Sequence, residues 1–398
     1  MPRRTVWFMA ISTGIVVANM YYMQPLLADV ARAFSLTSTQ IGAVAMLGQI
    51  GTACGMLFFI PLGDSHERRA LITTMVSCGT VALLLVATAR NPIWLTVACV
   101  AVGMLGSTVH VFVPFAAHLA APRERGRVVG TIFSGVLMGV LLARAFSGFV
   151  GSHLGWRTVY FIAAAMTLAV AVCTRFVLPR SRPTVALSWL DLLHSTFHLA
   201  RKHAALRDAG LLGATSFGCF SAFWTTLVFL LERPPYHYGA QTAGLFGLVG
   251  AAGAAGAPFV GRLTDRRGPR FAIGFSLIFL VLSYVVLGLA GKMIAGLIVG
   301  VLLLDFGANC LHVANLARIY ALDHTARSRL NMFYMVCYFS GGALGSIAGA
   351  YAWRLFGWPG VCGFCLVVLS LVALKFAFSR IQEVPHHSPV EDISFSEP

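Results

Sequence analysis

The chain has 398 residues, of which 58% are hydrophobic and only 11% are charged, and it carries a formal net charge of +15. Its mean hydropathy of +0.80 exceeds what a soluble domain of this length needs to fill a core. The composition therefore excludes an ordinary soluble protein and indicates a chain that lies in a lipid bilayer.

Apolar runs long enough to cross a bilayer recur along the whole sequence. A hydrocarbon core of about 30 Å requires roughly 20 apolar residues per helix, and the runs predict an all-α membrane protein with twelve transmembrane helices. The first run is too long, and is followed by too many others, to be a cleaved signal peptide. The predicted spans are 5–28, 39–62, 70–90, 92–118, 128–151, 155–178, 209–231, 240–260, 271–290, 292–318, 330–352 and 358–378.

Lysines and arginines orient these helices. With the N-terminus placed in the cytoplasm, twenty-two of the 29 basic residues fall on the cytoplasmic side, six fall outside and one, Arg144, lies within a span. This asymmetry predicts that both termini are cytoplasmic. It also explains the positive net charge by attraction to an anionic lipid leaflet, so we expect the lipid bilayer as a partner and no nucleic acid.

All nine cysteines lie within the predicted spans, where cysteine behaves as a small apolar residue. We therefore expect no disulfide framework and no metal site. Cys362 and Cys365 form a CxxC pattern inside an apolar helix, which favours packing over redox or metal chemistry. His194 and His198 lack an acidic third ligand, which favours a solvated helix face.

An internal repeat divides the sequence into two similar halves. It predicts two bundles of six helices in the same orientation, related by an axis along the membrane normal. The matched positions include Asp64 and Asp265, His110 and His312, and Gly155 and Gly357, at offsets of 201 or 202 residues. We expect the N-terminal bundle at 1–178, a cytoplasmic amphipathic linker at 179–208, the C-terminal bundle at 209–378 and a disordered cytoplasmic tail at 379–398.

The loop after the eighth span carries the pattern G-x-x-x-D-R-x-G-x-R at Gly261, Asp265, Arg266, Gly268 and Arg270. In the first-half copy Asp64 and Arg69 match, whereas Ile60, Ser65 and Glu67 replace a glycine, a basic residue and a second glycine. Together with the repeat and the long middle loop, these loops resemble the major facilitator superfamily across essentially the whole chain. Strings such as NMYYMQPLL at 19–27 and LLARAFSG at 141–148 are similar to its bacterial branch of predicted drug and arabinose efflux permeases.

The two charged loops are predicted to form a cytoplasmic gate. Gly261 and Gly268 permit a tight turn between membrane helices, and Asp265 can face the positive N-terminus of a neighbouring helix. Contacts of the arginines, worth about 0–1 kcal/mol each when exposed, would hold the cytoplasmic ends together as a latch. The alternative is that the arginines only set the topology. The predicted gate consists of Asp64, Arg69, Gly261, Asp265, Arg266, Gly268 and Arg270.

Asp305 lies in the middle of the tenth span, about 20 Å from the charges at either end, Lys292 and Arg318. A charged aspartate at the midplane costs roughly 2.5–3.5 kcal/mol, so it must find water, a partner or a proton. Asn309 and His312 continue the same helix face. Asp305, with His312 and its repeat equivalent His110, is the predicted carrier of a coupling proton; the alternative for the histidines is packing.

The resemblance implies that helices 1, 4, 7 and 10 line a central cavity. Arg144, seven residues or about 10 Å from the outer end of the predicted fifth span, can snorkel, form a structural ion pair, bind an anionic substrate group or pair with Asp305. Hydrogen bonding between helices is the alternative for the polar residues of the set. The predicted substrate cavity consists of Asn19, Tyr22, Gln24, Ser107, Arg144, Trp224 and Asn309.

These features predict a monomeric secondary transporter of the bacterial inner membrane. We expect it to export a drug-like amphiphile or a sugar by alternating access, with the proton gradient as its energy source and no cofactor. A sensor without transport, and a uniporter or importer of the same fold, remain alternatives. The motifs HExxH, G-x-S-x-G and G-x-x-x-x-G-K-[ST] are absent from the sequence, which argues against a zinc protease, a serine hydrolase and an ATP-driven pump.

Overall fold

The computed structural model describes residues 2–121, 123–181, 189–254, 257–323 and 326–378, without the side chains of residues 64–65 and 254–265. The predicted tail at 379–398 lies outside the described residues. Every regular element described is an α-helix, and the helices are α1 (Arg3–Ala18), α2 (Met23–Ala33), α3 (Ser38–Ser65), α4 (Arg68–Ala87), α5 (Pro92–Gly106), α6 (Val109–Leu119), α7 (Arg125–Leu154), α8 (Trp156–Val177), α9 (Trp189–Lys202), α10 (Ala204–Glu232), α11 (Ala240–Ala254), α12 (Ala257–Ala290), α13 (Ile294–Tyr320) and α14 (Arg327–Phe378).

These helices make up twelve membrane spans, which confirms the predicted number. The pairs α1–α2 and α5–α6 are each one interrupted span, whereas α12 and α14 each bend sharply, at Gly268 (φ 81°) and Gly357 (φ 64°). Ten stretches among the described residues are long and apolar enough to cross a membrane. That number counts α14 once and leaves out the eighth span, which includes residues 255–256.

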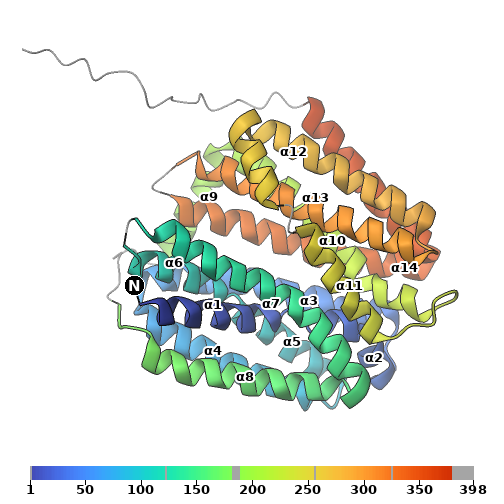
Figure 1. Ribbon diagram of the computed structural model, residues 1–398, viewed down its shortest axis with the longest axis horizontal. Helices are drawn as coiled ribbons and strands as arrows, with labels where there is room; N and C mark the ends of the chain where they lie inside the picture. The colour runs from blue at the N-terminus through green and yellow to red at the C-terminus, as the bar shows by residue number, and fades with distance from the viewer. Residues whose placement is uncertain (1, 122, 182–188, 255–256, 324–325, 379–398) are drawn as a thin grey trace, which may run out of the picture.

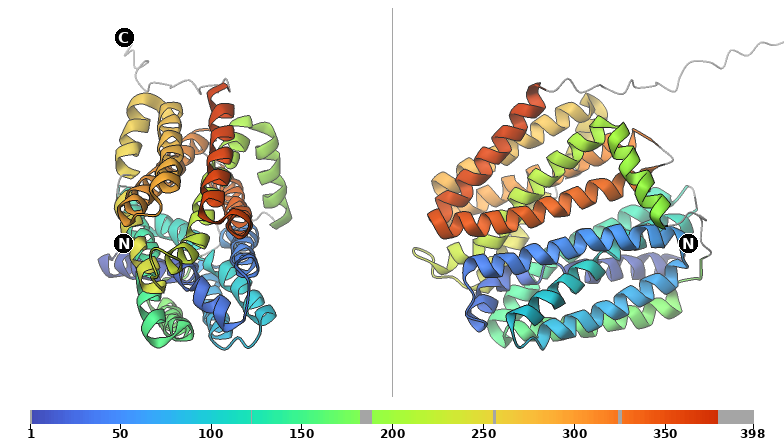
Figure 2. Two further views of the ribbon diagram at one scale, coloured as in Figure 1. Left: turned by 90° about the vertical axis from the view of Figure 1, so that its right-hand side faces the viewer. Right: turned by 180° about the vertical axis from the view of Figure 1, so that it is seen from behind.

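The spans form two bundles that lie side by side, α1–α8 in one and α10–α14 in the other (Figures 1 and 2). Gly155, between α7 and α8, and Gly357 both have positive φ angles, which a residue with a side chain rarely adopts. These two glycines are equivalent in the sequence repeat, so the last two helices of each bundle turn at matching places. We call the face with these two turns the outer face and the opposite face, with Gly268, the inner face.

The predicted first and fourth spans are interrupted, which the sequence analysis missed. The first was predicted as one run at 5–28, but α1 ends at Ala18 and α2 begins at Met23 and continues to Ala33. Pro25 fits the first turn of α2 because its missing N–H needs no partner there. The fourth span breaks at Ser107 and Thr108, whose hydroxyls donate to the carbonyls of the preceding turn.

Helix α9 lies in the stretch predicted as a linker and contacts both bundles. Its first residue, Trp189, stacks on Phe58 of α3 with the ring centroids 5.4 Å apart. Farther along α9, the Ser195 hydroxyl accepts a hydrogen bond from Arg329 of α14. Helix α10 already begins at Ala204, five residues before the predicted seventh span at 209–231.

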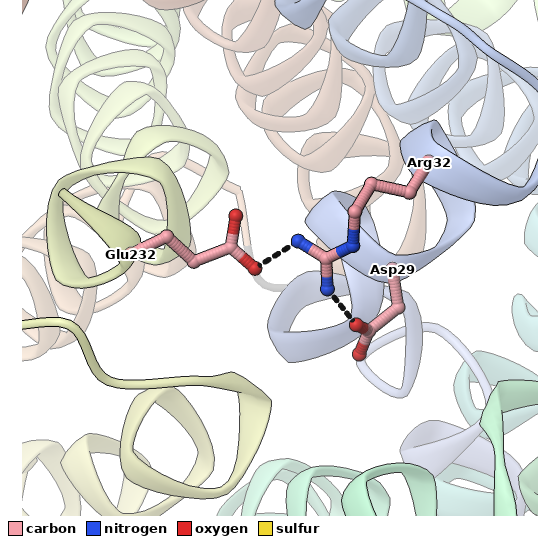
Figure 3. A network of polar contacts seen from close by, with 3 residues as sticks. All are labelled: Asp29, Arg32 and Glu232. Atoms are coloured by element: carbon pink, nitrogen blue, oxygen red, sulfur yellow. Dashed lines mark hydrogen bonds and ion pairs between the residues drawn. The ribbon is translucent and has the colours of Figure 1, made fainter.

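The two bundles are joined near the outer face. Arg32 of α2 forms ion pairs with Asp29 in its own bundle and with Glu232 of α10, the latter at 2.5 Å (Figure 3). Deeper in the membrane, Gln49 of α3 donates a hydrogen bond of 2.8 Å to Ser346 of α14. In Figure 2, α3 and the first half of α14 run alongside each other. These contacts hold the outer halves of the bundles together.

Candidate functional site

Arg144 of α7 is a buried cation at the boundary between the bundles. Arg144 is only 2% exposed, and its Nε donates a hydrogen bond of 2.7 Å to the Oε1 of Gln24 on α2. The guanidinium carbon lies 4.0 Å from the ring centroid of Trp224 on α10 and 5.0 Å from that of Tyr21. Cation–π contacts of this kind are worth about 2 kcal/mol or more when desolvated.

The depth predicted for Arg144 was too small. Helix α7 continues to Leu154, so Arg144 is ten residues, or about 15 Å, from the outer end of the helix rather than seven. Held there by Gln24 and Trp224, the guanidinium does not extend to the membrane surface, and snorkelling is excluded.

Asp305 of α13 is the matching buried anion. The residue is 4% exposed, and its carboxylate interacts electrostatically with Arg144 across the boundary between the bundles. Among the described residues, neither the Asp305 Oδ2 nor the Arg144 Nη2 has a hydrogen-bond partner. The two groups are therefore near each other but are not joined by a hydrogen bond. We call Arg144 and Asp305 the central pair.

Helix α11 packs against both members of the central pair with a row of buried glycines. A Cβ atom at Gly247 would lie 2.7 Å from the Arg144 Cβ, and a Cβ atom at Gly250 would lie 2.7 Å from the Asp305 Oδ2. Gly244 and Gly253 extend the row, so that the glycines recur every third residue. Small residues allow membrane helices to approach closely. This row was not predicted from the sequence, although the glycines recur at every third position in GLFGLVGAAG, residues 244–253.

A second polar group lies nearer the inner face. His312, seven residues after Asp305 on α13, contacts the Tyr334 hydroxyl at 3.1 Å through Nδ1, and its ring centroid is 5.0 Å from that of Tyr338. His110 of α6 is close enough to interact with His312 electrostatically, and both are half-buried. Tyr338 in turn lies near Tyr21 and Asp305. The structure therefore brings together the two histidines that are equivalent in the repeat.

Some predicted cavity residues lie away from the central pair. Asn19 donates a hydrogen bond of 3.1 Å to Thr167 of α8, inside the first bundle. Tyr22 is 2% exposed and packs against Phe146, whereas its neighbour Tyr21 lies against Arg144. Ser107 is fully buried and donates to the Met104 carbonyl.

The other predicted cavity residues lie beside the central pair. Gln24 and Trp224 contact Arg144, and Asn309 donates to the Asp305 backbone carbonyl at 2.8 Å.

The predicted gate residues that the structure describes contact their own bundles. Arg69 of α4 donates to the Arg175 and Leu178 carbonyls at the end of α8. Arg270 lies over the Phe376 ring, 5.7 Å from its centroid. Arg266 is exposed, and Gly268 adopts the positive φ that the turn needs. The side chains of Asp64 and Asp265 and the surroundings of Gly261 are not among the described parts of the chain, so the latch stays a prediction.

The first-half loop forms its turn without the second glycine of the motif. Glu67 takes that place and caps α4, accepting hydrogen bonds of 3.1 and 2.9 Å from the Arg69 and Ala70 backbone N–H groups. The Ser181 N–H adds a third at 3.0 Å. Burial raises the pKa of Glu67, but the three N–H donors outweigh it, so the pKa lies below its usual value.

We expect Glu67→Ala to lower the free energy of unfolding at neutral pH by about 0.5–2 kcal/mol, because α4 loses its cap. A lowered pKa in the folded state means that the charged form stabilises the fold above the unfolded-state pKa. This contribution is lost as the pH falls through the folded-state pKa. Thermal unfolding of both proteins from neutral pH to below about pH 4 measures it. The matched control is Glu67→Gln, which keeps an acceptor oxygen for the N–H groups but has no carboxyl group to protonate.

Comparison with known proteins identifies the family to which this architecture belongs. Residues 9–346 match the family described as the Major Facilitator Superfamily. The chain belongs to the major facilitator superfamily. An uncharacterized transporter of Escherichia coli O157:H7, YgaY, is 38% identical over 374 residues, covering 94% of this chain and 95% of that protein. A probable transporter of Streptomyces coelicolor is 33% identical, covering 89% and 82%.

Solved structures agree on the fold. The nucleoside transporter NupG superposes with a TM-score of 0.77 at 12% sequence identity, covering 94% of this chain and 99% of that one. At this identity the likeness concerns the fold alone. The chain is thus a multi-pass membrane transporter of the superfamily, and such a transporter takes a small-molecule substrate across the bilayer.

Proposed function

We propose that this chain is a proton-coupled secondary transporter of the bacterial inner membrane, acting as a monomer by alternating access, with the central pair as its coupling site. One observation supports this above the others: each bundle contributes one buried charge of opposite sign to their shared boundary. A buried charge without a partner is unfavourable by several kcal/mol. A proton on Asp305 removes the negative charge and so changes the energy of holding the bundles together at this place.

The coupling step follows from this charge balance. With Asp305 ionised, Arg144 and Asp305 attract each other, and the bundles are held close around α11. With Asp305 protonated, that attraction is lost, and the populations of the two conformations shift by the difference in interaction energy. His110 and His312, nearer the inner face, lie on the route by which a proton would reach the cytoplasm from Asp305.

Efflux in exchange for protons is the direction that the sequence resemblance implies, with a drug-like amphiphile or a sugar as substrate. It requires a substrate that competes with the proton for Asp305. A second candidate, proton-driven uptake, is favoured by a specific observation. In the described part of the chain, the Arg144 Nη2 and the Trp224 Nε1 are both buried and lack an acceptor. A substrate that supplies this acceptor does not compete with a proton on Asp305.

A substrate screen tests the proposal. Cells that lack their own exporters, with and without this chain, are incubated with a panel of amphiphiles, sugars and organic acids, and their contents are measured by mass spectrometry. Efflux is expected to lower the content of at least one compound and uptake to raise it, and a protonophore is expected to abolish either difference. A compound that binds the purified protein saturably without any change in cell content would instead indicate a sensor.

A further inference from the structure

We propose that the substrate is an organic anion, a monocarboxylate with a planar apolar body, which binds to Arg144 and Trp224 while Asp305 carries a proton. This inference rests on the proposed proton coupling at Asp305 and adds the class of the substrate. It also assigns the direction of coupling, because an anion and a proton that bind together travel together.

The charge balance at the central pair carries the first step. Arg144 stays charged under all physiological conditions, and it is 98% removed from solvent, since only 2% of the residue is exposed. Among the described residues, Asp305 supplies the carboxylate that interacts with Arg144 across the boundary, and protonation of Asp305 removes its charge. The guanidinium would then be a buried cation without a counter-charge, which is strongly unfavourable. A substrate carboxylate restores neutrality at this place.

Two buried hydrogen-bond donors near the central pair also favour a carboxylate. The Arg144 Nη2 and the Trp224 Nε1 belong to side chains in direct contact, and both are donors without an acceptor as far as the chain is described. The Arg144 Nε already donates its hydrogen bond to the Gln24 Oε1. A carboxylate accepts from a guanidinium and an indole at once, through its two oxygens. A cationic substrate would leave both donors unsatisfied.

The surroundings of the guanidinium indicate the rest of the ligand. Rings of Tyr21, Phe220 and Trp224 lie 5.0, 5.7 and 4.0 Å from the Arg144 guanidinium carbon. Next to them, Phe217 and Tyr338 stack with centroids 4.1 Å apart, and Tyr338 is half-buried. A planar apolar body would pack on such rings by offset stacking.

The coupling direction follows by linkage. If the proton on Asp305 raises the affinity for the anion, the anion raises the affinity for the proton by the same factor. The loaded state then carries both, and the empty state is the one in which Arg144 and Asp305 attract each other. A proton gradient directed into the cell would therefore drive uptake of the anion.

The test uses the purified full-length protein in detergent and three series of probes. Each series has a carboxylate, its neutral amide and an amine with the same ring: benzoate, benzamide and benzylamine; indole-3-acetate, indole-3-acetamide and tryptamine; 2-naphthoate, 2-naphthamide and 2-naphthylmethylamine. Dissociation constants are measured by calorimetry. Proton uptake is followed with a pH dye in weak buffer.

We expect at least one carboxylate to bind about tenfold or more tightly than its amide, with proton uptake on binding. Arg144→Gln should remove that preference, and Trp224→Phe, which keeps a ring but loses the N–H, should weaken carboxylate binding several-fold. The matched control is Arg157→Gln, because Arg157 lies over Trp156 at 4.3 Å in the same kind of pair at the exposed outer face. It should bind as the unchanged protein does.

The inference is overturned if no carboxylate binds more tightly than its amide, if an amine binds best, or if Arg144→Gln keeps the preference. Such an outcome leaves proton coupling at Asp305 intact, provided that acid still changes the conformation of the protein. Carboxylate binding that is lost in Arg144→Gln but takes up no proton would support the anion site and contradict coupling. The two failures are therefore distinguishable.

Discussion

Replacing Asp305 with asparagine is expected to abolish accumulation of substrate against its gradient while leaving exchange down a gradient in place. Asparagine has nearly the shape of a protonated aspartate but cannot release a proton, so the central pair can no longer alternate between two charge states. Vesicles loaded with a substrate from the screen and given an imposed pH gradient measure both activities. Accumulation above the external concentration should be lost, because the carboxyl group that carries the proton across the membrane is absent.

The control for this experiment is His312→Gln, which removes a titratable ring on the same helix and leaves the central pair intact. We expect it to slow transport without abolishing accumulation. If Asp305→Asn still accumulates substrate, coupling resides elsewhere, and the pair of His110 and His312 becomes the first candidate.

Replacing Gly250 with alanine is expected to reduce transport about tenfold or more without unfolding the protein. The added Cβ atom would lie 2.7 Å from the Asp305 Oδ2 and 2.9 Å from its Cγ, so the carboxyl group must move away from its place beside α11. Overpacking of this kind typically costs 1–3 kcal/mol, or about 5- to 150-fold in an equilibrium. Gly247→Ala should be more severe, because its Cβ atom would meet the Arg144 Cβ at 2.7 Å, and that atom cannot rotate away.

Two alanine variants separate this effect from helix packing in general. At Gly363 of α14 a Cβ atom meets no described atom within 4 Å, so Gly363→Ala should leave transport unchanged. At Gly14 of α1 the Cβ atom would meet the Gly135 carbonyl oxygen of α7 at 2.8 Å, within the first bundle, so Gly14→Ala should lower thermal stability more than Gly250→Ala does. Normal transport in a folded Gly250→Ala protein would contradict a coupling role for the Asp305 carboxyl at this position.

The fold and the central pair were accessible from the sequence for a simple reason. Charged residues inside long apolar runs are unfavourable, so Arg144 and Asp305 stand out against their surroundings, and the repeat predicted two bundles that meet. The periodicity of a helix also placed Asn309 and His312 on the face of Asp305.

The remaining features depend on where helices end and how they face. Tyr22 was predicted to line the cavity and Tyr21 contacts Arg144 instead, because the turn between α1 and α2 resets the helical phase just there. Arg144 was predicted too close to the membrane surface because the apolar run in the sequence ends before helix α7 does. A row of glycines shows in the sequence that helices approach closely, but only the packed structure tells which side chains they approach.

The central claim is that the charge state of Asp305 shifts the bundles between conformations, and a distance measurement without substrate tests it most directly. Spin labels are introduced through unnatural amino acids at Arg90 and Leu355, which are exposed at the outer face of different bundles. Distances between the labels are recorded by pulsed electron resonance at neutral and at acid pH. Glu232→Gln controls for any contribution of the ion pair with Arg32 at the same face.

The account predicts that the distance distribution of the unchanged protein and of Glu232→Gln shifts with acid. Asp305→Asn should give one distribution at every pH, matching that of the unchanged protein in acid, because asparagine imitates the protonated state. An equal acid-induced shift in Asp305→Asn would contradict the account.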